Sequence, residues 1–416
     1  MARDYITLLK NRKFIFLWSS QILSQITINI MNFLLLLNLF RNTGSTIATS
    51  FLWIAYALPA IIVGPIGAAA SDMFDRKKIL ALTNILQAIV ILLFAISHRS
   101  SMYLLYGVAV FYSFLNQFYV PAEISSLPQI VKKELFAYAN GVFFLTQQAA
   151  VIIGFGLAGP IQKLLGYDIS LLACSGMLIL AFVSVLKLPK LKTTDKMPYG
   201  FENAFTHFFT RIYEGYIYIK EHRNVLYPFI LLAGLQIALT VIVVNTPAIA
   251  VDIFNISTES IGTLIVVPGG LGAIVGTLLI PKILKKGIRK IKIIKISFVF
   301  LTLSLFLLTF LIPMIGYIHL LIIGFLILGT IGFSYVGILI PSQTFLQEQT
   351  PGGLRGRVFG NYWFIVTILT VFPVLISGTL SEIFGIKILM FILTGSVFAF
   401  SILINRKKEL FASKVI

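Results

Sequence analysis

Charge is scarce in this sequence. Asp, Glu, Lys and Arg make up only 12% of its 416 residues, whereas soluble domains carry about 25%. Hydrophobic residues account for 58% of the chain and the mean hydropathy is +0.96. This composition excludes an ordinary soluble protein and predicts a chain that is embedded in a membrane.

Cysteine and histidine are also rare. The single cysteine, Cys174, rules out an internal disulfide and any site built from several cysteines. The four histidines lie in predicted loops or at the ends of hydrophobic runs, and neither a Ser/His/Asp arrangement nor a phosphate-binding glycine loop is visible. We therefore expect no enzyme, no cofactor and no metal site.

Long hydrophobic runs dominate what is present. They approach the roughly 20 residues that a spanning helix needs and are too long for barrel strands, which alternate over about 10 residues. The sequence thus predicts an all-α integral membrane protein with twelve transmembrane helices. The predicted spans are 14–40, 48–70, 79–97, 102–121, 140–162, 169–187, 225–250, 260–281, 293–313, 318–341, 358–381 and 386–404.

The basic residues lie mostly on one side of these spans. Of 33 Lys and Arg residues, 29 fall on the side that holds both termini, and only Arg41, Arg99, Lys163 and Lys387 fall on the other. By the positive-inside rule both termini are cytoplasmic, and we expect the chain in the cell (inner, cytoplasmic) membrane. The net charge of +18 then reports topology and contact with anionic lipid headgroups, not nucleic-acid binding.

A polar segment divides the chain into three predicted parts. Residues 1–187 and 225–416 are the N-terminal and C-terminal six-helix halves, and 188–224 is a cytoplasmic linker. The linker contains an amphipathic pattern with apolar residues three and four apart, at Phe201, Phe205, Phe208, Ile212, Tyr216 and Ile219. It serves as a tether or as a regulatory site, and the sequence leaves both open.

Glycine and proline interrupt corresponding spans of the two halves. The second span contains Gly64, Pro65 and Gly67, and the eighth contains Pro268, Gly269, Gly270, Gly272 and Gly276. Paired interruptions of this kind are typical of transporters built from repeats, whose binding site lies near the bilayer midplane. Small residues also allow close helix packing, so glycine alone is weak evidence.

None of the 15 acidic residues lies at the centre of a predicted span. Glu123 and Asp252 lie near span ends and are the candidate proton sites. An interior without a central carboxylate favours a largely neutral, amphipathic ligand over a strongly cationic one.

Neutral polar side chains do occur within the spans. Gln21, Gln25, Asn29 and Asn32 recur at helical spacing on one face of the first span. Further candidates for a substrate path are Asn116, Tyr119, Gln147, Gln236, Asn245, Tyr335 and Asn361. These residues line such a path or form hydrogen bonds between helices, and the sequence alone permits either.

The charged turn after the second span resembles a known signature. Ala68-x-x-x-Asp72-Met73-x-Asp75-Arg76-Lys77 is similar to the G-x-x-x-D-R-x-G-R-R loop of the major facilitator superfamily. Pro121-Ala122 with Pro128 and Ala139-Asn140, Thr350-Pro351 through Val358, and Gly154 to Pro160 are similar to other segments of one branch. That branch contains macrolide-efflux-like drug:proton antiporters, enterobactin exporters and lysophospholipid flippases.

The resemblance implies the major facilitator fold and a monomeric secondary transporter that exports a small amphipathic, drug- or macrolide-like molecule by alternating access, with protons as coupling ion. It also implies a charged conformational switch on the cytoplasmic side. In this switch Asp72 lies near Arg355 or Arg357 at the start of the eleventh span, and Arg76 pairs with Glu123, beside Asp75. Many relatives carry an acid in the first span where this chain has Thr27-Ile28-Asn29.

Two other functions remain open. One is a lipid or lysophospholipid flippase of the same fold. The other is a membrane scaffold or sensor that transports nothing.

Overall fold

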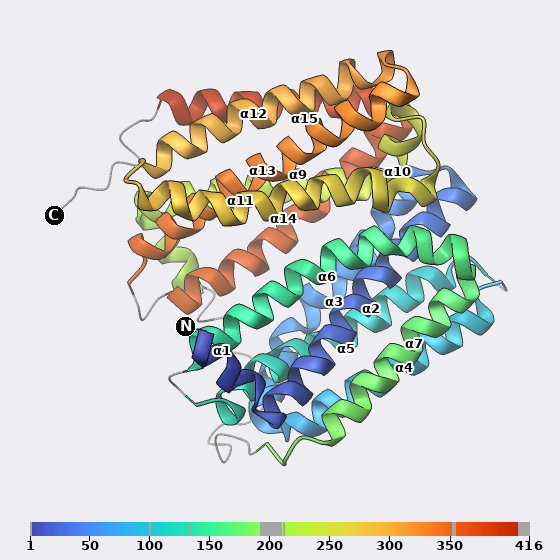
Figure 1. Ribbon diagram of the computed structural model, residues 1–416, viewed down its shortest axis with the longest axis vertical. Coiled ribbons are helices and arrows are strands. Elements are labelled where there is room, and N and C mark those ends of the chain that lie inside the picture. The colour runs from blue at the N-terminus through green and yellow to red at the C-terminus, as the bar shows by residue number, and fades with distance from the viewer. Residues whose placement is uncertain are drawn as a thin grey trace. The chain divides into compact units, whose positions relative to one another are not determined.

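The computed structural model describes residues 2–99, 101–132, 135–191, 210, 213–351 and 355–406, and this part of the chain is helical without strands (Figure 1). The first part of the chain forms α1 (Ala2–Leu9), α2 (Arg12–Thr43), α3 (Thr46–Met73), α4 (Arg76–Ser97), α5 (Leu104–Ile130), α6 (Phe136–Leu165) and α7 (Tyr167–Leu186). The second part forms α9 (Arg223–Val244), α10 (Thr246–Ala248), α11 (Val267–Lys285), α12 (Lys290–Phe310), α13 (Tyr317–Gln349), α14 (Arg355–Phe384) and α15 (Ile386–Arg406). Short π and 3-10 turns connect α10 to α11 at Ile249–Ile253, Thr258–Ser260 and Gly262–Val266, and Ile312–Met314 precedes α13.

Eleven helical segments of the described residues are long and apolar enough to cross a membrane. Among the long helices, α5 falls outside this set: it has 27 residues but carries Asn116, Gln117 and Glu123 as well as two prolines. At 1.5 Å per residue it reaches about 40 Å, which exceeds the roughly 30 Å hydrocarbon core. The all-α membrane fold is therefore confirmed, while the exact count of twelve spans stays a prediction.

The predicted amphipathic helix of the linker lies largely outside the described residues, including Phe201, Phe205, Phe208 and Ile212. Residues 213–221 are helical, and Ile219 is buried in an apolar cluster with Phe229 and Tyr362.

The chain forms two compact units. Unit 1 comprises residues 1–42 and 51–208, and unit 2 comprises 43–50 and 209–416. One short segment, 43–50, lies in the predicted N-terminal half of the sequence but belongs to unit 2. In that unit Thr46 donates to the Gly378 carbonyl at 2.7 Å, and Glu382 accepts a hydrogen bond from the Ile47 backbone N–H at 3.1 Å.

Unit 1 is organised around α4, which packs against both α5 and α7. Its apolar core gathers large side chains of α2 with Leu80 of α4 and Tyr119 of α5. Small polar residues join the helices at close range: Ser175 donates to the Ala88 carbonyl and Ser184 to the Phe16 carbonyl, at 2.9 and 2.8 Å. Each bond satisfies a hydroxyl that has no water available in hydrocarbon.

The start of α4 has a defined cap. The Asp75 side chain accepts a hydrogen bond from the Lys77 backbone N–H at 2.9 Å, which satisfies one of the amides left open at a helix start. The Lys77 ammonium donates to the carbonyl of Leu188, beyond the end of α7. Asp75 therefore fixes the position of the charged turn.

Replacing Asp75 with alanine should remove this cap and lower the free energy of unfolding by about 1 kcal/mol. Asp75→Asn keeps an oxygen acceptor and should retain most of the stability. Thermal unfolding of both variants in detergent tests the expectation. Equal melting temperatures for Asp75→Ala and the parent would contradict it.

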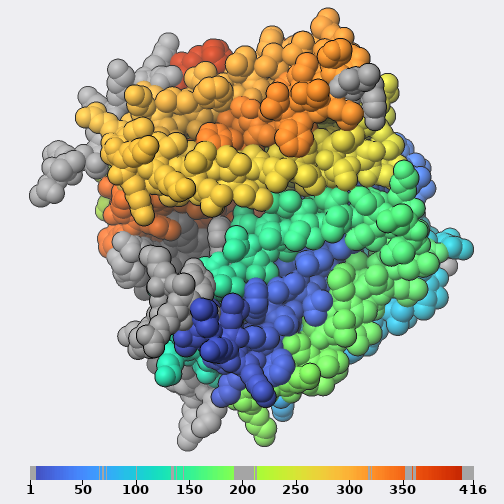
Figure 2. Space-filling view, in the orientation of Figure 1, coloured from blue at the N-terminus to red at the C-terminus, as the bar shows by residue number. Residues whose placement is uncertain are grey.

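Unit 2 is built on α13, which packs extensively against α11 and against α12 (Figure 1). The crossing with α11 is made by glycines: a Cβ on Gly272 would overlap the Gly329 carbonyl, and one on Gly332 would overlap the Gly269 carbonyl. Backbone thus meets backbone where the two helices cross. In Figure 2 the yellow surface of α11 and the orange surface of α13 adjoin on the face turned to the viewer.

Candidate functional site

A chain of buried polar side chains runs through unit 1 and ends at Glu123. The Tyr119 hydroxyl donates to the Glu123 carboxylate at 3.0 Å. The hydroxyls of Ser20 and Tyr119 lie 3.2 Å apart, and the Asn84 amide donates to Ser20 at 3.1 Å. Ser20, Asn84 and Tyr119 have no exposed surface, and Glu123 is only 4% exposed. Three helices, α2, α4 and α5, therefore supply one continuous hydrogen-bonded path.

The donors in this path all point toward the carboxylate. Because Tyr119 gives its single proton to Glu123, its oxygen accepts from Ser20, which in turn accepts from Asn84. Such an aligned chain strengthens each of its bonds in a low-dielectric interior. It stabilises an ionised carboxylate that burial alone would disfavour.

The same path can carry the opposite polarity. A protonated Glu123 can donate to Tyr119, whose hydroxyl then turns toward Ser20. Asn84 offers the terminal acceptor, because its Oδ1 is buried without a partner among the described residues. A half-turn of that amide presents Oδ1 to Ser20, so Glu123, Tyr119 and Ser20 stay linked by hydrogen bonds in both protonation states of Glu123.

Sequence reasoning identified Glu123 and Tyr119 but missed Ser20 and Asn84. Asn84 and Gln87 stand three residues apart in an uncharged, mostly apolar run, and both are fully buried. Since an amide pair in a spanning helix requires a partner, this spacing was the available signal.

Arg76 and Glu123 have other hydrogen-bond partners in this structure, and their predicted pairing in the switch stays a prediction. The Arg76 guanidinium donates to the Ser71 carbonyl at 3.1 Å and to the Ser125 carbonyl at 2.8 Å, and it is 4% exposed. Glu123 instead accepts from Tyr119. The guanidinium thus contacts backbone carbonyls near the ends of α3 and α5, and Arg76 links the charged turn to α5.

The other predicted switch residues have mixed outcomes. Asp75 is the α4 cap described above. Asp72 belongs to α3, and Arg355 and Arg357 belong to the first turn of α14. The side chains of these three residues lie outside what the structure describes, so their switch role stays a prediction.

Asp252 differs from Glu123 in its surroundings. It lies in the π-helical turn Ile249–Ile253 and its side chain is exposed. Because its carboxylate is exposed and belongs to no buried hydrogen-bonded path among the described residues, Asp252 is the weaker of the two candidate proton sites.

The polar stripe of α2 separates into two kinds of residue. Gln21 and Asn29 are buried. Gln21 donates to the Phe143 carbonyl of α6 at 3.2 Å, and Asn29 donates to the Gln25 carbonyl one turn earlier in α2 at 2.7 Å. Gln25 and Asn32 are half-buried. Four-residue steps advance about 40° around a helix, which is why one stripe reaches two environments.

Two predicted path residues of unit 1 come together. The Tyr56 hydroxyl of α3 interacts with the side chains of Asn32 and Asn116, both half-buried. Gln147, by contrast, is exposed. The amides of α2 and α5 therefore form one polar patch around a tyrosine.

The residues of unit 2 that were predicted to line the substrate path also differ in burial. The Tyr335 hydroxyl donates to Gln236 at 3.4 Å, and both side chains are half-buried. Asn245 is fully buried and donates to Ser377 at 3.0 Å, which is a bond between helices. The side chain of Asn361 lies outside the described residues.

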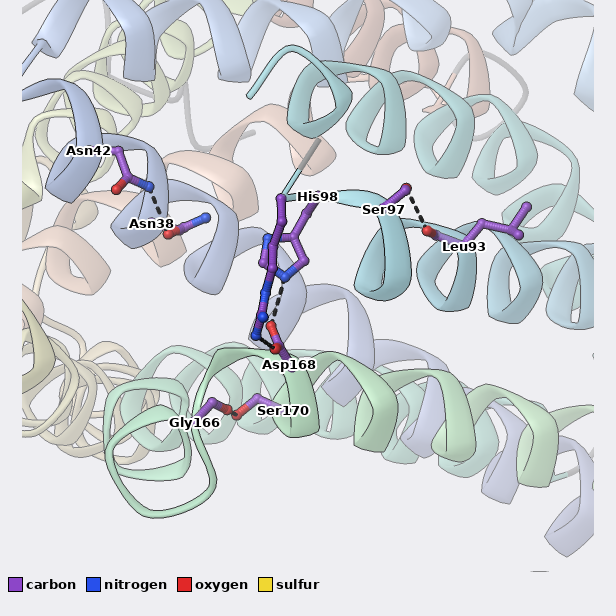
Figure 3. Close-up of polar contacts among 9 residues, drawn as sticks. Asn38, Asn42, Leu93, Ser97, His98, Gly166, Asp168 and Ser170 are labelled. Atoms are coloured by element: carbon purple, nitrogen blue, oxygen red, sulfur yellow. Dashed lines mark hydrogen bonds and ion pairs between the residues drawn. The ribbon is translucent and has the colours of Figure 1, made fainter. Parts of the chain in front are cut away.

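An ion-pair cluster at the other end of unit 1 escaped the sequence analysis (Figure 3). His98, which follows α4, lies 2.7 Å from the Asp168 carboxylate in the first turn of α7, and Arg99 pairs with the same carboxylate. The Tyr167 ring packs edge-on against His98 at 5.1 Å. Arg99 is 79% exposed, and exposed ion pairs contribute little energy. We therefore interpret the cluster as a connection between the end of α4 and the start of α7, not as a binding site. Among the described residues, no group of three or more His, Cys, Asp or Glu residues is arranged to hold a metal ion.

Comparison with known proteins identifies the class. Residues 17–372 match the family model described as Major Facilitator Superfamily. The chain therefore belongs to the Major Facilitator Superfamily, and it is a multi-pass membrane transporter of that family.

Individual relatives are distant. The chain is 27% identical to the uncharacterized MFS-type transporter YfiS of Bacillus subtilis, over 86% of this chain and 83% of that protein. It is 23% identical to macrolide efflux protein A of Streptococcus pyogenes, over 92% of this chain and 93% of that one.

Solved structures share the fold. A POT family transporter in complex with 5-aminolevulinic acid gives a TM-score of 0.74 at 12% identity, covering 97% of each chain. A bacterial homolog of the human lysosomal transporter Spinster gives 0.72 at 13%, covering 98% of this chain and 99% of that one.

Proposed function

We propose that this protein is a proton-coupled exporter of a small amphipathic molecule of the macrolide class. It acts by alternating access as a monomer in the cell membrane, with both termini in the cytoplasm. The observation that carries the proton coupling is the buried chain Asn84–Ser20–Tyr119–Glu123.

The proton is carried by Glu123. A proton carrier must be stable both with and without its proton. The hydrogen-bonded path from Asn84 to Glu123 can run in either direction, so it supplies a hydrogen bond to the carboxylate and to the carboxylic acid. The Tyr119 hydroxyl donates to Glu123, and Arg76 of the charged turn donates to the carbonyls of Ser71 and Ser125. A carboxyl group poised in this way can load on one side of the membrane and release on the other.

The cargo class is supported by the neutral interior and by one relative. The half-buried amides Asn32 and Asn116, placed around Tyr56, offer hydrogen bonds and an aromatic surface without charge. Macrolide efflux protein A is similar over almost the whole chain. We infer that Asn32 and Asn116 contact the polar groups of the cargo.

The test uses purified protein in proteoliposomes with an imposed pH gradient and radiolabelled erythromycin. We expect uptake that depends on the gradient and proton movement that depends on the drug. Labelled lysophosphatidylethanolamine is the second substrate. Gradient-dependent movement of the lysolipid without movement of the drug would replace the exporter with a flippase, and inactivity toward both in protein that unfolds cooperatively would reject transport of either class.

A further inference from the structure

An open apolar groove lies on unit 2, where α13 forms the floor between α11 and α12. It encloses about 360 Å³, within the usual range for small-molecule sites. Its walls and floor include Leu271 and Val275 of α11, Phe300 of α12, and Leu326, Thr330 and Phe333 of α13. The glycine crossing of α11 and α13 shapes it, because Gly272 and Gly329 contribute no side chain to the lining.

The groove opens outward. Val275 is 47% exposed and Phe300 is 50% exposed. On spanning helices such surfaces contact lipid, so the medium that enters this groove is hydrocarbon and not water.

A basic turn joins the same two walls. Five exposed bases lie at the end of α11 and the start of α12, namely Lys282, Lys285, Lys286, Arg289 and Lys292. The segment 282–295 contains no acidic residue. Its ion pair within the described part of the chain joins Lys290 to Glu348 of α13. Such a cluster attracts anionic headgroups.

The spacing between the groove and the basic turn matches one leaflet. Val275 precedes Lys285 by ten residues and Phe300 follows Lys290 by ten, which is about 15 Å along each helix. Half of a 30 Å hydrocarbon core is also about 15 Å. Exposed apolar residues continue the path between the two features, with Leu278 on α11 and Ile296 and Val299 on α12.

We propose that α11, α12 and α13 form a binding site for an anionic phospholipid. The headgroup binds the basic turn, through Lys285, Lys286 and Lys292. One acyl chain follows the exposed stripes of α11 and α12, and its end occupies the groove beside Val275 and Thr330. The site is independent of the cargo and of proton coupling.

Photocrosslinking tests the site directly. Full-length protein is reconstituted with phosphatidylglycerol that carries a diazirine at the end of one acyl chain, or with the matching phosphatidylcholine. We expect crosslinks on peptides within 268–333, with phosphatidylglycerol labelling exceeding phosphatidylcholine labelling about fivefold. Equal labelling by both lipids, or crosslinks confined to other helices, overturns the proposal.

Paired variants separate the headgroup from the chain. Lys285→Gln/Lys286→Gln should reduce phosphatidylglycerol labelling to the phosphatidylcholine level, whereas Lys163→Gln/Lys387→Gln, two exposed lysines outside the basic turn, should not. Val275→Trp fills the groove and should abolish labelling at α13. Its control, Ile388→Trp on α15, replaces a side chain of similar exposure, 46% against 47%, and should leave labelling unchanged. Unaltered labelling in Val275→Trp would refute occupancy of the groove.

Discussion

Glu123→Gln should abolish transport driven by a pH gradient while leaving the folded protein intact. Glutamine keeps the size of the side chain and can still accept the hydrogen bond from Tyr119, but it cannot take up and release a proton. Loss of a positioned proton-transfer group is expected to reduce gradient-driven flux by about a hundredfold or more. Flux in proteoliposomes, with and without the gradient, measures the effect.

Cargo exchange in the absence of a gradient should persist in this variant, because the amide patch of Asn32 and Asn116 is untouched. Its melting temperature should equal or exceed that of the parent, since a buried carboxylate costs more free energy than a buried amide.

Asp252→Asn is the matched control for this experiment. It also removes one carboxylate, but from an exposed turn, and should leave gradient-driven flux at the parental level. Loss of coupling in Asp252→Asn together with normal coupling in Glu123→Gln would assign the proton to Asp252. Tyr119→Phe, which removes the hydroxyl that both polarities of the chain require, should slow proton movement without eliminating it.

Gly272→Ala should destabilise unit 2 strongly. The added methyl group would overlap the Gly329 carbonyl, a backbone atom that cannot turn aside as a flexible side chain can. Overpacking of a closely packed core costs about 1–3 kcal/mol, and the rigid partner places this variant at the upper end. Thermal unfolding in detergent should show a clear fall in melting temperature.

Gly395→Ala provides the control for that prediction. Gly395 lies in α15, and a Cβ placed there meets nothing within 4 Å. Because alanine favours a helix over glycine by about 1 kcal/mol, this variant should be as stable as the parent or more stable. Equal stability of Gly272→Ala and Gly395→Ala would show that α11 and α13 do not cross as closely as the structure indicates.

The sequence predicted the membrane spans correctly wherever hydrophobic residues continue over the length of a helix. Hydrophobic runs of about 20 residues placed the spans, and eleven of them reappear as helices long and apolar enough to cross a membrane. The charged turn and the segments that resemble the superfamily placed the chain in it, and the family match over residues 17–372 agrees. Both depend on local pattern, which a sequence displays directly.

The partners of each polar residue were decided by the tertiary structure alone. Helical periodicity gives the face on which Gln21 or Glu123 lies but not the helix that meets that face. Ser20 and Tyr119 are 99 positions apart in the chain, and Asn84 lies 64 positions from Ser20, yet the three form one path to Glu123. For the same reason Arg76, which the sequence suggested as the partner of Glu123, binds the carbonyls of Ser71 and Ser125.

The groove of unit 2 follows the same rule. Its glycines were visible in the sequence as interruptions of a span, but only the crossing of α11 with α13 turns them into a surface that a lipid chain can enter. Hydrophobicity is a property of single residues and determines which segments enter the membrane. Packing is a property of pairs, and it determines which of those residues act together.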